Sequence, residues 1–427
     1  MEALKTRSAE ELQLFKQQLE QEYAQFKALK LNLNMARGKP SSEQLDLSLP
    51  LLDVLRSDSN LTSEEGFDCR NYGVNFGIKE ARRFMGWLLD DDPDHIIVCG
   101  NASLNIMYDA LARYWMFGVL GSTPWGKLDK VKWICPTPGY DRHFSLCEEF
   151  GIEMISVPLL DDGPDMDIVE SLVATDASIK GIWCVPKYSN PSGITYSDET
   201  VKRLASMPCA AQDFRIFWDN AYSVHHLYNQ ENLHDSLLDI RACCDEYKNP
   251  DRAIKFSSTS KITFPGAGLS ALASSNDNLK EIKKHMSIQT IGHDKFNQLR
   301  HVRYITSFDE LTFHMQKHAD LIRPKFELVE KMLGAELENL EIAHWTKPRG
   351  GYFVSFDGLD NTAKRTIALA QDAGVVLTAA GSTYPYKHDP HDSNIRIAPT
   401  LPTLEELEKA LEVFICCVKL AAVETLL

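Results

Sequence analysis

The 427-residue sequence predicts an α/β protein whose larger part is a mainly parallel, doubly wound sheet. Two observations lead to this fold class. Between residues 66 and 275, short β-rich runs alternate with stretches long enough for helices, which is the pattern of strand–helix–strand units. After Gly350 and Gly351 the pattern changes to strand-like runs and a terminal helix, which predicts a smaller α+β domain.

The N-terminal segment is expected to begin with a helix. Ser8 followed by Glu11 is the signature of a capping box. Apolar residues then recur at helical spacing to about Lys30, so one face of this helix needs a partner surface. The polar stretch 36–42 is expected to be irregular. We assign residues 1–60 to this helix and an arm that pack with the small domain, 61–300 to the large domain and 301–427 to the small domain.

The large domain contains seven predicted strands and at least two predicted helices between them. The helices cover residues 104–115 and 197–205. The strands cover residues 96–99, 132–135, 153–157, 181–185, 215–218, 253–256 and 271–273. In doubly wound sheets, ligands bind at the carboxyl ends of the strands. Residues that follow these runs are therefore the candidates for chemistry.

A polar, helix-rich stretch covers residues 276–335. The small domain then has two strand-like runs, at residues 352–356 and 394–397. Thr403 and Glu406 form a second capping box and open the last helix, which carries Leu407, Leu411 and Phe414 on one face.

Composition excludes several classes of protein. The net charge of -15 argues against a nucleic-acid binder and against an anionic membrane surface. No apolar run reaches the roughly 20 residues that span a bilayer, and the first residues do not form an apolar signal segment. The ten cysteines contain no CxxC pair, which argues against a zinc ribbon and favours no metal. Reduced cysteines in a cytoplasmic protein are the simplest interpretation.

Three residues just after predicted strands have side chains suited to catalysis. Lys261 follows the run 253–256, and burial near cofactor charge would bring its amine toward neutrality. Asp219 ends the run 215–218 and needs a partner such as a protonated ring nitrogen. Tyr222, three residues later, has a phenol suited to a cofactor oxygen. Each is also typical of an ordinary feature: a surface lysine, a helix cap and a structural tyrosine.

Three further segments fit a site for an anionic cofactor and substrate. Asn190 begins an Asn-Pro-Ser-Gly turn after the run 181–185, which is also common in any protein. The segment from Gly100 to Ser103 opens a helix, where free amides and the dipole favour a phosphate, although an ordinary N-cap fits equally well. Arg396 lies between isoleucines, and such a guanidinium pairs with a substrate carboxylate or with a structural acid.

In this order, the motifs resemble the fold-type-I enzymes of the class I/II aminotransferase superfamily, which depend on pyridoxal 5'-phosphate (PLP). The resemblance spans nearly the whole chain, from Arg37 to Arg396. It is greatest with a bacterial aspartate aminotransferase subgroup that includes proteins called MocR-like. The segments that support it are residues 36–47, 70–73, 100–104, 136–144 and 261–268.

The resemblance implies a role for each matching position. Lys261 would carry PLP as a Schiff base and later move the α-proton, while Asp219 would pair with the ring nitrogen. Tyr222 and Asn190 would contact the ring oxygen. Tyr140 would stack on the ring face. The phosphate would be held by Asn101, Ala102, Ser103 and Ser258, with Tyr72 reaching it from a neighbouring subunit of a homodimer.

The substrates implied by the resemblance are an amino acid and a 2-oxo acid, most simply aspartate and 2-oxoglutarate in a ping-pong transamination. Arg396 would bind the α-carboxylate, with the Gly38 backbone closing over it. A second carboxylate calls for a second cation, and Arg142 is the first candidate. Arg300 and Arg303 are alternatives, and each of the three also fits a solvated surface arginine.

One departure from the family pattern concerns the phosphate. Many relatives carry an arginine shortly after the lysine, whereas residues 262–269 of this chain contain no basic residue. Two other functions share the same motifs. A PLP-dependent carbon–sulfur lyase would break a different bond. A regulatory PLP-binding module of the MocR type would need a DNA-binding domain, for which the N-terminal region offers only one amphipathic helix before Arg37.

Overall fold

The computed structural model describes residues 3–427. Its main feature is an eight-stranded sheet with the strand order β2-β9-β8-β7-β6-β3-β4-β5. These strands are β2 (Ile96–Val98), β3 (Lys132–Thr137), β4 (Glu153–Leu160), β5 (Gly163–Pro164), β6 (Ile179–Cys184), β7 (Arg215–Asp219), β8 (Ala253–Ser258) and β9 (Ser270–Ala273). All seven runs predicted from the sequence are strands.

The sheet is mainly parallel, which confirms the predicted fold class. The five strands β4, β3, β6, β7 and β8 are parallel to their neighbours in this series, whereas β9, β2 and β5 pair antiparallel at the two ends. Because β6, β7 and β8 run in one direction, their carboxyl ends lie at the same edge. Asp219 is the last residue of β7 and pairs with Phe256, near the end of β8.

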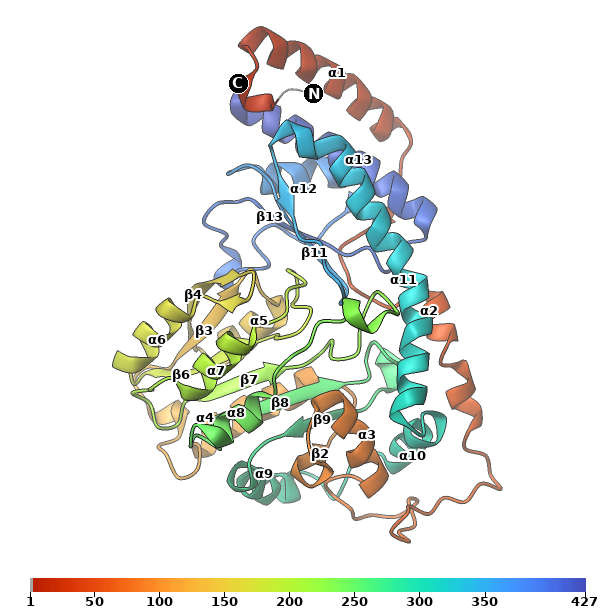
Figure 1. The fold of residues 1–427 in the computed structure, drawn as a ribbon, viewed down its shortest axis with the longest axis vertical. Coiled ribbons are helices and arrows are strands. Elements are labelled where there is room, and N and C mark those ends of the chain that lie inside the picture. Colours follow the sequence, from red (N-terminus) through yellow and green to blue (C-terminus); the bar gives the residue numbers. More distant parts are fainter. Residues whose placement is uncertain (1–2) are drawn as a thin grey trace.

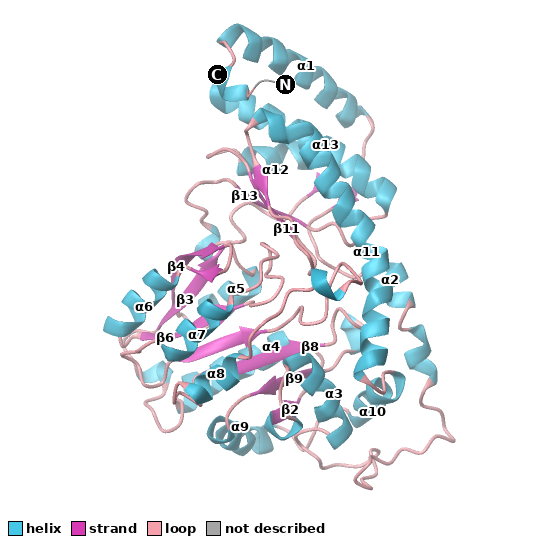
Figure 2. Ribbon diagram, in the orientation of Figure 1, coloured by secondary structure: helices cyan, strands magenta, loops and turns pink. Residues whose placement is uncertain are grey.

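Helices cover both faces of the large sheet (Figures 1 and 2). Successive side chains of a strand point to opposite faces, so Trp133 packs in one hydrophobic core and Ile134 in the other. The first core contains residues of α4 (Ser103–Phe117), α5 (Asp141–Glu149) and α9 (Asn276–Gln289). The second contains residues of α6 (Met166–Thr175), α7 (Asp198–Ser206) and α8 (Ile240–Glu246). Helices α3 (Lys79–Leu89) and α10 (Lys295–Tyr304) pack beside β2 and β9.

A second, smaller assembly lies above the large sheet in Figure 1. It contains an antiparallel sheet of β10 (His344–Trp345), β11 (Val354–Asp357) and β13 (Asn394–Ile397), and a parallel pair of β1 (Leu33–Asn34) and β12 (Val375–Val376). Its helices are α1 (Ala9–Ala28), α12 (Ala363–Asp372) and α13 (Leu404–Leu426), together with the C-terminal half of α11 (Phe308–Leu337). The α11 helix runs alongside both assemblies, and α2 (Ser42–Asp46) lies against it.

Both predicted capping boxes are present. The Ser8 and Thr403 side chains accept from the amides of Glu11 and Glu406, whose carboxylates accept in return from the cap amides. The partner surface that α1 needs is α13, against which it buries Leu19. Within residues 3–427, none of the helices combines the length and hydrophobicity needed to cross a bilayer. All ten cysteines are free thiols.

Candidate active site

A cavity of about 800 Å³ lies where the carboxyl ends of β6, β7 and β8 meet the smaller assembly. It collects eleven of the residues that the sequence pointed to. Those that line it are Gly38, Ala102, Ser103, Tyr140, Arg142, Asn190, Asp219, Tyr222, Ser258, Lys261 and Arg396. Asn101 and Tyr72 do not line it. The positions come from five separate strand ends and from both assemblies, so their convergence is a property of the fold.

Asp219 is buried at the end of β7 with its two oxygens in different environments. Oδ2 lies 3.0 Å from His143 Nε2 on α5. A carboxylate only accepts hydrogen bonds, so this pairing requires the proton on Nε2. The His143 ring is in turn stacked on Trp183, with 4.3 Å between ring centroids. Oδ1 is buried and finds no hydrogen-bond partner within residues 3–427, so one acceptor remains for a ligand.

Lys261 lies in the turn after β8, with its amine beside two stacked aromatic rings. Nζ is 4.9 Å from the ring centroid of Tyr222 and 5.8 Å from that of Tyr352. Burial lowers the pKa of Lys261, the charge of Asp219 opposes this change, and the charge of Arg396 adds to it. The amine is therefore more easily neutral than that of an exposed lysine. Burial also raises the pKa of Tyr222 well above its usual value, which keeps the phenol protonated.

The turn that carries Lys261 is held from behind by buried polar groups. The carbonyl of Ile262 accepts from His314 Nε2 at 2.7 Å and from His318 Nε2 at 3.0 Å, both on α11. Nε2 of Gln44, on α2, lies 3.2 Å from His318 Nδ1 and donates to the Tyr352 hydroxyl at 2.8 Å. Burial lowers the pKa of His318 to about 3, so this network contains neutral imidazole. The lysine turn, α2 and α11 are thus connected directly.

The start of α4 forms a neutral cup beside the lysine. Ala102 is the N-cap and Ser103 the first residue of the helix, so their free amides face the cavity edge. Across the cup, Ser258 Oγ donates to Ser260 Oγ at 3.0 Å, and both serines line the cavity. Asn101, unlike Ala102 and Ser103, does not line the cavity. Its Nδ2 donates to the Pro265 carbonyl and its Oδ1 accepts from the Gly268 amide, which ties the lysine turn to the cup.

Arg396 approaches the cavity from β13 of the smaller sheet. Nη1 donates to Asp141 Oδ1 at 3.1 Å and to Asn190 Oδ1 at 3.3 Å, and Nη2 donates to Thr378 at 3.4 Å. Its guanidinium carbon lies 4.8 Å from the ring centroid of Phe353. Gly38 packs against the tip of the same ring, where an added Cβ atom would lie 2.4 Å from Phe353 Cζ, so a larger residue would require the ring to move.

The remaining predicted residues differ in their exposure. Tyr140 is the N-cap of α5 and meets the His143 ring edge-to-face, 4.9 Å between centroids. Arg142 is exposed at the cavity mouth. Tyr72 is 78% exposed on the surface. Arg300 and Arg303, the alternative cations, lie on α10 and are not among the cavity-lining residues.

Sequence comparison identifies the family to which these residues belong. The chain matches the aspartate amino-transferase family over residues 7–427. It belongs to the aspartate aminotransferase family. An aspartate aminotransferase of Corynebacterium glutamicum is 45% identical over 417 residues, which are 97% of this chain and 95% of the relative.

Structure comparison agrees. The crystal structure of an aspartate transaminase from Corynebacterium glutamicum superimposes with a TM-score of 0.96 at 44% identity, covering 100% of this chain and 99% of the other. A kynurenine aminotransferase of Pyrococcus horikoshii, solved in complex with PMP, has a TM-score of 0.75 at 18% identity and covers 93% of each chain. At that identity the likeness shows the shared fold alone.

Members of the aspartate aminotransferase family bind PLP, and the residues of this cavity fit that cofactor. The decisive observation is the buried, unpartnered Oδ1 of Asp219, an acceptor that a protonated ring nitrogen would satisfy. The buried amine of Lys261 faces the same cavity, and the amides at the start of α4 suit a phosphate.

Several residues of this aminotransferase site were not predicted from the sequence: His143, Asp141, Ser260, Thr378 and Phe353. The need of Asp219 for a partner was foreseeable, but the partner is 76 residues away along the chain. One signal was available: His143 lies one helical turn after Tyr140, which places both on the same side of α5.

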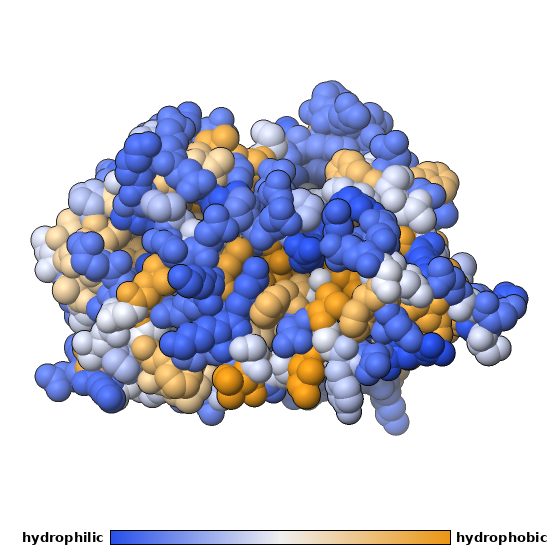
Figure 3. All heavy atoms as spheres, turned by 90° about the horizontal axis from the view of Figure 1, so that it is seen from below, coloured by the Kyte–Doolittle hydropathy of each residue, from blue (hydrophilic) through white to orange (hydrophobic). Residues whose placement is uncertain are grey.

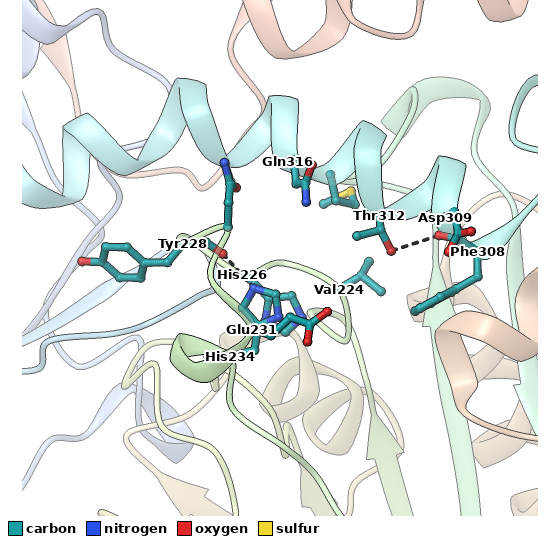
Figure 4. Close-up of a pocket in the computed structure, with 12 residues that line it drawn as sticks. Val224, His226, Tyr228, Glu231, His234, Phe308, Asp309, Thr312 and Gln316 are labelled. Atoms are coloured by element: carbon teal, nitrogen blue, oxygen red, sulfur yellow. Dashed lines mark hydrogen bonds between the residues drawn. The ribbon is translucent and has the colours of Figure 1, made fainter.

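A second cavity, of about 440 Å³, lies behind the lysine turn and shares no lining residue with the first. Figure 4 shows its two walls. Phe308, Asp309 and Thr312 project from the first turns of α11, and His226 and His234 come from the segment after β7. The imidazole rings of His226 and His234 are stacked on each other, with 3.7 Å between their centroids.

Proposed function

We propose that this protein transfers the amino group of L-aspartate to 2-oxoglutarate by a ping-pong reaction, with PLP held covalently by Lys261. The observation that carries the proposal is the shared cavity: Lys261, Asp219 and Arg396 all line it, and Asp219 Oδ1 is left without a partner. An amine, a ring-nitrogen acceptor and a carboxylate-binding cation are the three groups that transamination of an α-amino acid requires.

When bound, PLP supplies an electron-accepting ring that stabilises negative charge at the substrate α-carbon. The chain's own residues would hold and tune it. Asp219 would accept a hydrogen bond from the ring nitrogen, and the hydrogen bond from His143 holds the Asp219 carboxylate in place. The Tyr222 phenol, protonated because burial raises its pKa, would donate to the ring oxygen together with the Asn190 amide. Tyr140 would cover the ring face.

Neutral donors would hold the phosphate, in place of the family arginine that residues 262–269 lack. We assign this role to the α4 amides at Ala102 and Ser103 and to the hydroxyls of Ser103, Ser258 and Ser260. The N-terminal end of α4 adds a partial positive charge. Asn101 supports the cup from outside, through its bonds to Pro265 and Gly268.

Lys261 would also move the proton at the α-carbon. Its amine would act as a general base, because burial lowers its pKa and favours the neutral form. Arg396 orients the substrate by binding its α-carboxylate, and the close packing of Gly38 on Phe353 closes that side. Arg142 at the cavity mouth is the proposed partner of the distal carboxylate of aspartate.

The assembly we propose is a homodimer with shared active sites, located in the cytoplasm. Tyr72 lies outside the cavity of its own chain and is exposed, which supports a contact with the partner's phosphate. The ten free thiols fit a reducing compartment.

The test is a single half-reaction of the purified PLP-loaded protein with L-aspartate. The proposal expects pyridoxamine phosphate and oxaloacetate in equal amounts, and Lys261→Ala should yield neither. Ammonia and pyruvate from a substrate with a leaving group would instead identify the carbon–sulfur lyase. A substrate scan against 2-oxoglutarate then ranks the amino acids. Normal turnover of Lys261→Ala would overturn the assignment.

A further inference from the structure

The carboxylate-binding arginine already has an anionic partner. Arg396 Nη1 forms an ion pair with Asp141 Oδ1 at 3.1 Å. Asn190 Oδ1 and Thr378 Oγ1 accept the other hydrogen bonds of its guanidinium, at 3.3 and 3.4 Å. Both of those groups are neutral, so Asp141 is the acid that balances the charge of Arg396.

Asp141 reaches Arg396 from the cavity side. It is the first residue of α5, directly after Tyr140, and it lines the same cavity as Arg396. Its side chain is 34% exposed, whereas that of Arg396 is 8% exposed. The acid therefore sits where a substrate carboxylate would approach. Arg396 Nε is buried and has no hydrogen-bond partner in the part of the chain that the structure describes, so the guanidinium keeps one donor for a ligand.

We propose that Asp141 sets the affinity of this cavity for carboxylates, by holding Arg396 when no substrate is bound and repelling the incoming anion. The inference rests on the carboxylate-binding role proposed for Arg396. A substrate carboxylate must either displace Asp141 from Nη1 or bind beside it through Nε, and both routes place two negative charges on one guanidinium. Asp141 thus makes binding weaker and release of the product easier.

The inference predicts that Asp141→Asn binds carboxylates more tightly. Asparagine keeps the shape of the side chain and removes the charge. An ion pair of this exposure predicts a fall in the dissociation constant of about twofold to fivefold. If Asp141 instead only positioned Arg396, the same substitution would weaken binding, because the guanidinium would lose an anchor. The two roles therefore move the measured constant in opposite directions.

The experiment titrates the PLP-loaded protein with succinate, a dicarboxylate that has no amino group and cannot react, and follows the heat of binding. Wild type, Asp141→Asn and Asp198→Asn are compared. Asp198 is an exposed acid in the first turn of α7, so it controls for loss of a carboxylate at a helix start. We expect tighter succinate binding and a lower KM for aspartate with Asp141→Asn, and wild-type constants with Asp198→Asn.

Unchanged or weaker succinate binding by folded Asp141→Asn would overturn the inference. Circular dichroism checks folding, and Asp141→Ser, which also suits a helix start, replaces the variant if asparagine does not fold. Arg396→Gln separates this inference from the proposed function. If Arg396→Gln binds succinate like wild type, the assignment of Arg396 as the carboxylate-binding residue is wrong. If it loses binding while Asp141→Asn matches wild type, only the role of Asp141 is wrong.

Discussion

At the scale of single residues, the environment of Lys261 predicts its reactivity. An amine acylates only when neutral, and burial lowers the pKa of Lys261. In the cofactor-free protein, labelling of Lys261 by a small amine-directed reagent should therefore reach its half-maximal rate at a lower pH than labelling of the exposed lysines. Mass spectrometry of the labelled peptides, followed over a pH series, gives both values for one sample.

Two substitutions should move this midpoint in opposite directions. Asp219 raises the pKa of Lys261 and Arg396 lowers it. Asp219→Asn should therefore shift the labelling curve further toward low pH, and Arg396→Gln should shift it toward high pH. A shift of both variants in the same direction would mean that the charges of these two residues do not act on the amine.

A second prediction at this scale concerns Arg142. Because it is the cavity-lining cation proposed to meet the distal carboxylate, Arg142→Ala should lower kcat/KM for aspartate about tenfold more than for alanine, the equivalent of ~1.4 kcal/mol. Arg300→Ala and Arg303→Ala, on α10, are the matched controls. Equal losses for aspartate and alanine in Arg142→Ala would remove it as the specificity residue.

Single residues could be predicted where their position followed from a strand end. Lys261, Asp219 and Asn190 each come just after a β-rich run, and parallel strands bring such positions together. His143 and Asp141 could not be predicted in this way. Both lie on α5 and contact a strand residue far away in the sequence, Asp219 or Arg396. A contact between such distant side chains leaves no periodic signal in a sequence.

At the scale of elements, length decided what the sequence could predict. Every strand of the large sheet with three or more residues was predicted, because alternation or a continuous apolar run is visible over that length. The two-residue strands β1, β5, β10 and β12 were not, since two residues have no period. β1 pairs with β12 across 342 residues, from Leu33 to Val375, so only the tertiary fold creates it.

The buried ion pair between β6 and the segment before β7 should matter for stability. The Asp213 carboxylate accepts hydrogen bonds from Lys180 Nζ at 2.7 Å and from Trp125 Nε1 at 2.8 Å. Asp213→Asn leaves the lysine charge buried without its partner, which should cost about 3 kcal/mol in the free energy of unfolding. Denaturant unfolding at neutral pH measures it. Glu153→Gln, which breaks the exposed pair with Lys130, is the control and should change the value by about 0.5 kcal/mol or less.

The effect of Asp213→Asn should depend on pH. Burial alone would raise the pKa of Asp213, but its bonds to Lys180 and Trp125 outweigh this and hold the pKa below the usual 3.8. A carboxyl group with a lowered folded-state pKa stabilises the fold above its unfolded pKa and loses that contribution as pH falls through the folded value. The difference between wild type and variant should therefore be full at neutral pH and shrink below pH 3.8. A constant difference down to strong acid would contradict the pairing.

At the scale of the whole molecule, the two ends of the chain complete one assembly. The sequence showed that the first helix needs a partner but not which one. The partner is α13, and Tyr23 of α1 also donates to the Leu369 carbonyl of α12 at 2.9 Å. The division of the chain at residues 60 and 300 stays a prediction. Whatever those boundaries are, Arg396 from one assembly and Lys261 from the other must stay aligned across one cavity.

The shared-site dimer is a prediction about the surface. Three large hydrophobic side chains face solvent in the single chain: Tyr72 is 78% exposed, Ile288 88% and Ile291 61%. The Gly73 amide donates to the Ile291 carbonyl at 3.2 Å, so the two segments lie side by side. Hydrophobic side chains also show among hydrophilic ones on the lower face of the molecule (Figure 3). Clustered apolar surface of this kind favours association.

Mixing two defective variants tests whether active sites are shared. Lys261→Ala removes the lysine, and Tyr72→Ala removes the group proposed to reach the partner's phosphate. In a hybrid dimer, one site has its lysine from the Tyr72→Ala subunit and its tyrosine from the Lys261→Ala subunit, so it is intact. After dissociation and random reassociation of equal amounts, half of the dimers are hybrids with one intact site. Activity should therefore rise to about a quarter of the wild-type value, well above either variant alone. If the mixture only averaged the two variants, each subunit would hold a complete site of its own, and Tyr72 would have no role in the partner's cavity.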